Sequence, residues 1–159
     1  MGKEIDKNKI VVFTGAGISA ESGLKTFRDS GGLWNDYVVE DVATVNAWIR
    51  NPRLVLDFYN ERRNDVRKAE PNAAHLAIAE LQSKYEVIVV TQNVDDLHER
   101  AGSKNVIHVH GEITKARSCS DDEQLFDIGY EPIKFGQLCE NGNQIRPHIV
   151  WFGEDVIRY

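Results

Sequence analysis

A glycine-rich turn directly after a buried strand constrains the fold of this chain more than any other feature. Residues 9–13 (KIVVF) are apolar and β-branched, which predicts a strand, and the small residues at 15–17 (GAG) let the backbone approach a pyrophosphate. A dinucleotide-binding fold would continue with a long helix. Residues 21–36 instead combine glycines, charges and aromatic side chains, a composition that predicts an ordered loop.

Helical and strand patterns alternate along the following segments. Apolar spacing predicts helices at about 42–49, 52–68, 73–83 and 95–101, and β-branched runs predict strands at 86–91 and 105–110. The helix at 73–83 would bury Leu76 and Leu81. The predicted fold class is α/β, a Rossmann-like parallel sheet with a helical insertion at about 37–70. The sheet is incomplete in this chain, since a sheet averages ~5–6 strands.

The pattern changes after residue 110. Residues 111–146 scatter glycine, proline, aspartate and asparagine without a clear period, which predicts a small irregular module inserted into the sheet domain. Strand character returns at 149–154. The Rossmann-like domain would therefore comprise residues 1–110 and 147–159.

Composition excludes several classes of function. The chain has 159 residues, 42% of them apolar and 28% charged, as in ordinary globular proteins. Its net charge of −6 argues against a nucleic-acid-binding protein, which is usually basic. Nothing resembles a signal peptide or a run of ~18 apolar residues, so we expect a cytoplasmic protein that binds no membrane. We also expect a monomer, with Cys119 and Cys139 as free thiols.

Reactive side chains follow the ends of three predicted strands. Thr14–Gly17, Thr91–Asp95 and His108–Gly111 would meet at the carboxyl edge of the sheet, where such folds bind ligands. Each has a plainer interpretation: a tight turn, a helix cap at Asp95, and a structural histidine. The amides and carboxylate of the second segment nonetheless suit a ribose or a carboxamide, and His110 is a natural proton acceptor near neutral pH.

Four segments occur together in a fixed order. They are GAGISAESGLKTFRD at 15–29, TQNVDDLH at 91–98, His110-Gly111, and RPHIVWFGE at 146–154. Together they resemble the signatures of the sirtuins, the NAD-dependent protein-lysine deacylases. The resemblance covers essentially the whole chain. A sirtuin catalytic core continues beyond the fourth signature, so we expect the chain to be truncated at its C-terminus.

The resemblance implies that NAD is cleaved at its glycosidic bond rather than used for hydride transfer. The loop after residues 15–17 would cover the nicotinamide ribose and keep water out. The amide oxygen of the substrate would replace nicotinamide on the ribose. The products would be nicotinamide, O-acyl-ADP-ribose and free lysine.

The resemblance also implies roles for the matched residues. His110 would be the general base, with Asn93 as the second catalytic residue. Phe27 would shield the reacting carbon, and Arg28 would add charge near the phosphates. The implied NAD-binding residues are Gly15, Ala16, Gly17, Ile18, Glu21, Phe27, Arg28, Trp34, Gln92, Asn93, Val94 and Asp95.

Two groups of residues would recognise the acyl-lysine protein or peptide substrate. The first is the substrate segment, which would pair with the peptide backbone: Val150, Trp151, Phe152, Gly153 and Glu154. The second is Tyr59 and Arg62, which share a helix face and suit a carboxylate. The plainer interpretation is an arginine on a solvated face. Their spacing resembles the bacterial-type class III sirtuins, so we expect succinyl- and malonyl-lysine as substrates and acetyl-lysine as a poorer one.

The segment 111–146 departs from the family pattern. Most sirtuins hold a structural zinc ion there with two pairs of cysteines, whereas this chain has Cys119 and Cys139 alone. A structural zinc site needs four ligands, and Asp122 would supply only a third. We therefore expect a module that folds without zinc, and we assign no metal ligand.

Two other functions fit the same residues. A catalytically inactive module would bind NAD or an acyl peptide without consuming NAD. A mono-ADP-ribosyltransferase would transfer label onto protein. A dehydrogenase is disfavoured, because the helix after Gly17 is interrupted and nothing marks a hydride acceptor.

Overall fold

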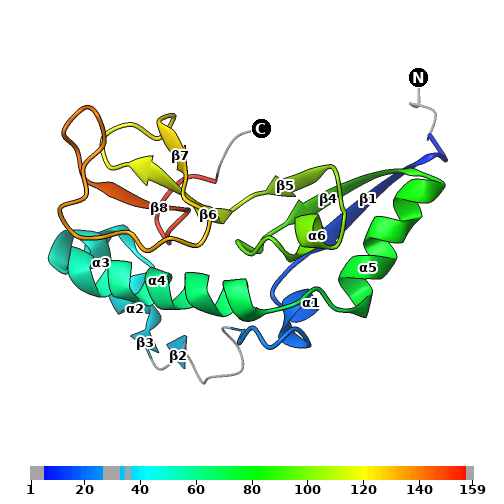
Figure 1. Cartoon of the computed structure of the whole chain (residues 1–159), viewed down its shortest axis with the longest axis horizontal. Helices are drawn as coiled ribbons and strands as arrows, with labels where there is room; N and C mark the ends of the chain where they lie inside the picture. Colours follow the sequence, from blue (N-terminus) through cyan, green and yellow to red (C-terminus); the bar gives the residue numbers. More distant parts are fainter. Residues whose placement is uncertain (1–5, 27–32, 35–36, 157–159) are drawn as a thin grey trace.

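A computed structural model describes residues 6–26, 33–34 and 37–156 (Figure 1). Its parallel sheet has three strands in the order β1-β4-β5: β1 (Lys9–Thr14), β4 (Glu86–Thr91) and β5 (Val106–His108). Thr14 pairs with Thr91, and Thr91 pairs with His108, so the strands end level with one another. The predicted parallel α/β sheet is confirmed.

Short helices and one long helix connect and cover the strands. They are α1 (Gly17–Ala20), α2 (Val39–Val42), α3 (Val45–Arg50), α4 (Pro52–Lys68), α5 (Ala73–Glu80), the 3-10 helix η2 (Leu81–Ser83) and α6 (Leu97–Arg100). A two-stranded antiparallel hairpin, β2 (Leu33–Trp34) and β3 (Tyr37–Val38), precedes α2. The helix after the glycine turn lasts only four residues, which agrees with the prediction that no long helix follows this turn.

The long helix α4 has strong signals at its start. The Asn51 side chain accepts the N–H of Leu54, and Pro52 occupies the first turn, where its missing N–H costs nothing. Arg67 and Lys68 lie in the last turn, where positive charge is favourable. The helix runs along the long axis of the molecule, from the second sheet toward the parallel sheet (Figure 1).

The second sheet is antiparallel, with the order β7-β6-β8: β6 (Gly111–Ser118), β7 (Leu125–Asp127) and β8 (Ile145–Ile149). The predicted strand at 149–154 is therefore wrong. The strand ends at Ile149, and Phe152 makes only an isolated bridge with Thr44. The backbone turns there because the Glu154 carboxylate accepts the N–H of Trp151 (2.8 Å) and Gly153 has a φ of 95°.

The buried face of α5 also differs from the prediction. Leu76 and Leu81 are 54% and 37% exposed, whereas His75 is fully buried. His75 and Asn72 form a reciprocal capping box, and the His75 ring packs edge-on against His98 with 4.9 Å between centroids. Local capping, rather than apolar spacing, therefore sets the orientation of this helix.

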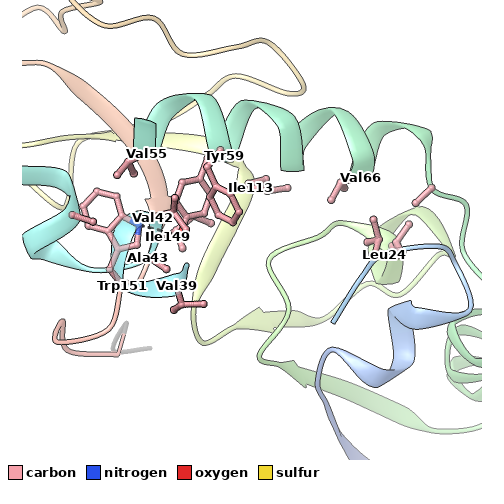
Figure 2. Packing of buried hydrophobic residues seen from close by; sticks show 14 residues of the cluster. Leu24, Val39, Val42, Ala43, Val55, Tyr59, Val66, Ile113, Ile149 and Trp151 are labelled. Atoms are coloured by element: carbon pink, nitrogen blue, oxygen red, sulfur yellow. Dashed lines mark hydrogen bonds between the residues drawn. The ribbon is translucent and has the colours of Figure 1, made fainter. Parts of the chain in front are cut away.

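The main core lies between α4, the α2–α3 segment and β8. Figure 2 shows Tyr59, Trp151 and Val42 gathered there, with Tyr59 and Trp151 1% and 2% exposed. A second cluster joins α4 to the antiparallel sheet and comprises Leu56, Ala116, Ile133 and Ile145. Because α4 contributes to both clusters, it fixes the side chains on its buried face relative to the α2–α3 segment and the antiparallel sheet. Within the described ranges, none of the helices is long and apolar enough to cross a membrane.

Candidate active site

The level ends of the three parallel strands bring the predicted site segments together. The turn after β1, the turn after β4 and the segment after β5 all leave the sheet at one edge. The Gln92 N–H donates to the Thr14 carbonyl at 3.0 Å, and the Val109 N–H donates to the Thr91 carbonyl at 3.0 Å. These hydrogen bonds extend the sheet ladder by one residue and hold the segments side by side.

Three buried polar side chains form a hydrogen-bonded cluster at this edge. The Asn93 amide donates to Ser19 Oγ at 3.0 Å, and the Ser19 hydroxyl donates to Asp95 Oδ2 at 2.9 Å. Asp95 Oδ1 accepts the Leu97 N–H at 3.2 Å, so this residue contacts the start of α6 as well as the cluster, although the N-cap position of the helix is Asp96. Burial raises the pKa of Asp95, although the hydrogen bonds from Ser19 and Leu97 oppose that rise.

Two neighbouring cavities of about 260 and 280 Å³ open at the same edge. The first is bordered by the polar cluster, by Ala16 of the glycine turn and by Arg62. The second is bordered by Tyr59 and by the substrate segment at 150–154. Four residues line both cavities: Gln92, Val94, His110 and Phe152. His110 therefore lies on a wall that the two cavities share.

The His110 ring has a defined tautomer. Its Nδ1 atom lies 3.1 Å from the Gln92 carbonyl oxygen, which only accepts hydrogen bonds, so Nδ1 carries the hydrogen. The other nitrogen, Nε2, is then the proton acceptor of the neutral ring. The arrangement suits a general base.

The residue after His110 must be glycine. Gly111 has a φ of 84°, and a Cβ atom there would lie 2.0 Å from the His148 carbonyl oxygen of β8. The backbone of β8 thus packs directly against the turn that carries the histidine. The Val150 N–H also donates to the His110 carbonyl at 3.0 Å.

The turn at Gly15–Gly17 suits the phosphates of a dinucleotide. A Cβ atom at Gly17 would meet no atom within 4 Å, so the backbone faces open space there. A Cβ atom at Gly15 would lie 3.8 Å from Gln92 Oε1. The turn thus leaves room for a ligand beside the polar cluster, and these residues fit NAD.

Other predicted NAD-binding residues are placed differently. Ile18 is half-buried, and its carbonyl accepts a hydrogen bond from the Asn72 amide at 2.7 Å, whereas Glu21 is exposed. Phe27 and Arg28 lie outside the described residues. Only the backbone of Trp34 is described, within β2.

Tyr59 and Arg62 are buried rather than solvated. They are 1% and 8% exposed, which contradicts the plainer interpretation of a solvated arginine face. The Trp151 indole N–H donates to the Tyr59 hydroxyl at 3.1 Å, and Arg62 Nη1 lies 4.0 Å from Asp65 Oδ2. Burial raises the pKa of Tyr59 and lowers that of Arg62. The tyrosine therefore stays neutral at physiological pH.

The substrate segment already uses much of its backbone within the chain. The Phe152 N–H donates to the Ala43 carbonyl at 3.0 Å, and the Glu154 N–H donates to the Trp151 carbonyl at 3.0 Å. The Trp151 side chain is buried, whereas Phe152 is 65% exposed. Phe152 and Gly153 therefore form the exposed part of this segment.

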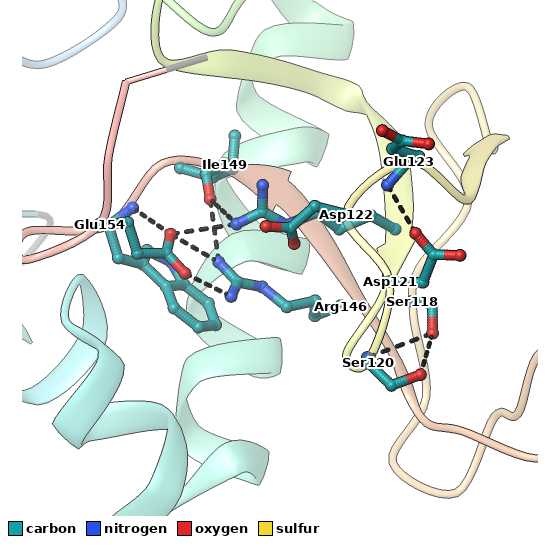
Figure 3. Close-up of polar contacts among 10 residues, drawn as sticks. Ser118, Ser120, Asp121, Asp122, Glu123, Arg146, Ile149 and Glu154 are labelled. Atoms are coloured by element: carbon teal, nitrogen blue, oxygen red, sulfur yellow. Dashed lines mark hydrogen bonds and ion pairs between the residues drawn. The ribbon is translucent and has the colours of Figure 1, made fainter. Parts of the chain in front are cut away.

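An ion-pair network ties the substrate segment to the second sheet (Figure 3). Glu154 lies 2.7 Å from Arg146 of β8 and 3.0 Å from Arg117 of β6, which are 7% and 5% exposed. The Arg146 guanidinium also stacks 3.3 Å from the centre of the Trp151 ring. Burial alone would raise the pKa of Glu154, but hydrogen bonds from Arg146 and the Trp151 N–H, with both guanidinium charges, hold it below its usual value.

The second sheet does not bring four metal ligands together in the described part of the chain. That part holds no group of three or more histidine, cysteine, aspartate or glutamate side chains suited to a metal ion. Asp122 lies 3.3 Å from Arg117 Nε, and Cys139 Sγ lies 3.7 Å from Ser118 Oγ. These contacts do not fit a structural zinc site, and a module that folds without zinc stays a prediction.

Sequence reasoning missed several residues of the site. Ser19 lies within the first signature, which was the available signal for it. Arg117 carries no such signal, because it pairs with Glu154 across 37 positions of sequence. The same holds for Glu99, whose partner His108 lies on a different element.

Comparison with known proteins agrees with this geometry. A sequence model described as the Sir2 family matches residues 15–159. A protein of Helicobacter pylori named NAD-dependent protein deacylase is 51% identical over 147 residues, which cover 92% of this chain and 62% of that relative. The chain therefore spans less than two thirds of that relative's length.

Solved structures give the same result. A structure described as a Sir2 homolog–NAD complex matches with a TM-score of 0.82 and 42% identity, covering 95% of this chain and 59% of the other. A structure of a Sir2 protein bound to a propionylated peptide matches with a TM-score of 0.73 and 31% identity, covering 95% of this chain and 61% of the other.

Proposed function

Because the chain belongs to the Sir2 family, we propose that it acts in NAD-dependent removal of acyl groups from protein lysine side chains. One observation carries the proposal. His110, with Nε2 as its proton acceptor, lies on the wall between a cavity that suits nicotinamide and its ribose and a cavity beside the substrate segment. The name of the Helicobacter pylori relative and the acyl-peptide complex of a Sir2 protein support the same reaction.

The NAD side of the site would be built from the turns after β1 and β4. The backbone at Gly15–Gly17 would hold the phosphates, and Gln92 would bind ribose hydroxyls. Asn93 and Asp95 would bind the nicotinamide carboxamide, since an amide and a carboxylate match its donors and acceptor. NAD would supply an ADP-ribosyl group whose bond to nicotinamide breaks, and one water molecule would be consumed, so that the acyl group ends on the ribose and lysine is released.

The role of His110 is to accept a proton from a ribose hydroxyl. Its Nδ1–H donates to the Gln92 carbonyl, so the ring is held with Nε2 directed away from that bond. The same Gln92 lines both cavities, so the ribose-binding residue and the base are positioned by one turn. On the peptide side, Phe152 and Gly153 would meet the backbone of the substrate.

We propose succinyl- and malonyl-lysine as the preferred substrates. Arg62 borders the first cavity and Tyr59 borders the second, and both come from the buried face of α4. A guanidinium and a neutral phenol are both donors, which suits a carboxylate at the end of the acyl chain. An acetyl group offers no such partner, so acetyl-lysine would react less well.

Mass spectrometry of the products tests this function. The chain is incubated with NAD and equal amounts of succinyl- and acetyl-lysine forms of one peptide, with His110→Ala as the matched control. We expect O-succinyl-ADP-ribose, nicotinamide and free lysine from the unmodified chain, and at least about 100-fold less of each from the control. Binding of NAD without its consumption would instead indicate a binding module, and label on protein would indicate an ADP-ribosyltransferase.

A further inference from the structure

Two histidines, one at the end of β5 and one just after it, support the turn after β4. His110 Nδ1 lies 3.1 Å from the Gln92 carbonyl oxygen, and His108 Nδ1 lies 2.8 Å from the Asn93 carbonyl oxygen. Consecutive carbonyls of the turn are therefore each held by an imidazole. The proposed reaction uses His110, whereas it gives no role to His108, which is 4% exposed.

The two rings differ in what faces their second nitrogen. His108 Nε2 lies 2.8 Å from Glu99 Oε1, at the start of α6. A carbonyl oxygen and a carboxylate oxygen both accept hydrogen bonds, and neither can donate one. Both nitrogens of His108 must then carry hydrogen, so the geometry requires an imidazolium.

The charged and titratable groups around His108 favour that form. Glu99 and His98 face it from α6, Asp95 from the turn, and Glu112 from β6. The three carboxylates favour a cation, and His98 has a pKa lowered to about 4 by burial, so it is neutral near pH 7. Burial alone would lower the pKa of His108, but the hydrogen bond and charge of Glu99, with the Asn93 carbonyl and Glu112, raise it.

The carbonyl that His108 holds belongs to a residue of the proposed nicotinamide site. The Asn93 side chain donates to Ser19 Oγ at 3.0 Å, and its backbone N–H donates to Thr91 Oγ1 at 3.0 Å. His108 supplies the remaining anchor, on the carbonyl side of the same residue. Rotation of the Asn93–Val94 peptide group would move the Asn93 side-chain amide away from Ser19 Oγ and from the cavity.

We propose that His108 is a positioning residue that acts as an imidazolium bridge between Glu99 and the Asn93 carbonyl, and that its protonation fixes the Asn93 side chain in the ligand cavity. The proposal rests on the proposed function only in giving that cavity to nicotinamide. Loss of the second proton at high pH would remove one of the two donors. The turn would then loosen and the Asn93 side chain would lose its fixed position, although the residues that contact ligand keep the same chemical form.

The effect on folding follows from the direction of the shift. The pKa of His108 is raised in the folded chain above its ordinary value of 6.5. The resulting stabilisation is fully present below pH 6.5 and is lost as the pH rises through the folded-state pKa. The ligand cavity should therefore be best ordered on the acidic side of this transition.

Heteronuclear NMR of the histidine rings tests the imidazolium without NAD or peptide. In the 159-residue chain we expect both ring nitrogens of His108 to carry hydrogen at pH 7. We expect the Asn93 side-chain amide resonances to move with the same midpoint as His108. Glu99→Gln should lower that midpoint for both residues together. Glu112→Gln removes a carboxylate that faces His108 without bonding it, and should have a much smaller effect.

The outcomes separate this inference from the proposed function. A single-tautomer neutral His108 ring at pH 7 would overturn it, and so would Asn93 resonances that ignore the His108 titration. Calorimetry then measures nicotinamide and NAD affinity, and we expect Glu99→Gln to weaken both about tenfold at pH 8 while Glu112→Gln leaves them within about twofold. Failure of the unmodified chain to bind NAD would count against the proposed function alone, because the NMR result stands independently.

Discussion

Tyr59 accepts a hydrogen bond from the indole N–H of Trp151 at 3.1 Å, and both side chains are almost completely buried. The bond links the long helix to the substrate segment. It also orients the phenol, because the oxygen accepts on the indole side and its own O–H is left to donate elsewhere. The residue proposed to select the acyl group is thus held by the segment proposed to bind the peptide.

Replacement of Arg62 by methionine should change acyl preference more than overall activity. Arg62→Met keeps the buried hydrocarbon but removes the guanidinium, so kcat/KM for succinyl-lysine should fall at least about tenfold while that for acetyl-lysine stays within about threefold. Arg67→Met, on the exposed side of α4, is the matched control. An equal loss on both substrates would remove Arg62 from acyl recognition.

Tyr59→Phe should reduce both specificity and stability. The change leaves the Trp151 N–H buried without its acceptor, which costs about 1–3 kcal/mol in the free energy of unfolding. Urea denaturation measures that cost. Comparison of the succinyl-to-acetyl kcat/KM ratio in the folded variant separates recognition from stability, and an unchanged ratio would leave Tyr59 with a structural role only.

His110→Ala should lower kcat by about 10²–10⁴-fold while NAD affinity changes little. The reason is that the ring offers a proton acceptor at Nε2, whereas Asn93, Ser19 and Asp95 are held by hydrogen bonds to one another that do not involve His110. Single-turnover kinetics and calorimetry provide the two readouts. Turnover within tenfold of the unmodified chain would exclude His110 as the base.

Loss of the Glu154 carboxylate should destabilise the protein strongly. Glu154→Ala leaves Arg117 and Arg146 buried without their shared partner, which costs about 3–5 kcal/mol. Asp122→Ala is the matched control, because Asp122 contacts the same Arg117 but its side chain is 78% exposed, so its loss should cost only about 0–1 kcal/mol. Similar unfolding free energies for the two variants would contradict a central role for the network.

Gly111→Ala should have a lower free energy of unfolding than an alanine substitution at another glycine where backbone strain is the only cost. Gly129→Ala is the control, since Gly129 also has a positive φ, of 53°, but a Cβ atom there would meet nothing within 4 Å. Strain should cost about 1–2 kcal/mol in each, and the clash with the His148 carbonyl adds to that only at Gly111. Thermal melts of both variants give the comparison.

Acid should destabilise the fold through two buried histidines. Burial lowers the pKa of His98 to about 4, and burial with the charge of Arg117 lowers that of His148 to about 4. The unfolded chain therefore binds protons that the folded chain does not, and stability is lost as the pH falls from 6.5 toward 4. Urea denaturation between pH 7 and pH 4 should show this slope, and His148→Gln should reduce it.

The sequence predicted those parts of the structure that rest on local patterns. The strand at 86–91 and the helix at 52–68 were correct, because β-branched runs and capping residues act within a few positions. The strand predicted at 149–154 failed because Glu154 turns the backbone through a contact with Trp151, and no hydrophobic pattern reports such a bond. Leu76 failed as a core residue for the same reason, since a capping box orients its helix.

The site was predictable only in part, for a related reason. Strand-end positions placed Gln92, Asn93 and His110 at one edge, because parallel strands fix where their ends meet. The partners that orient these residues come from other elements. Glu99 belongs to α6 and Arg117 to β6, and their contacts depend on tertiary packing that a period or a motif does not encode.

Because the histidines differ in burial, the rate at which a reagent modifies His110 can report whether a ligand is bound. Of the five histidines, four are 7% exposed or less, and the fifth is His110 on the wall between the two cavities. An imidazole-directed acylating reagent such as diethyl pyrocarbonate should therefore modify His110 first. The rate of that single mass addition, with and without a candidate ligand, would show whether either cavity is filled even when no reaction takes place.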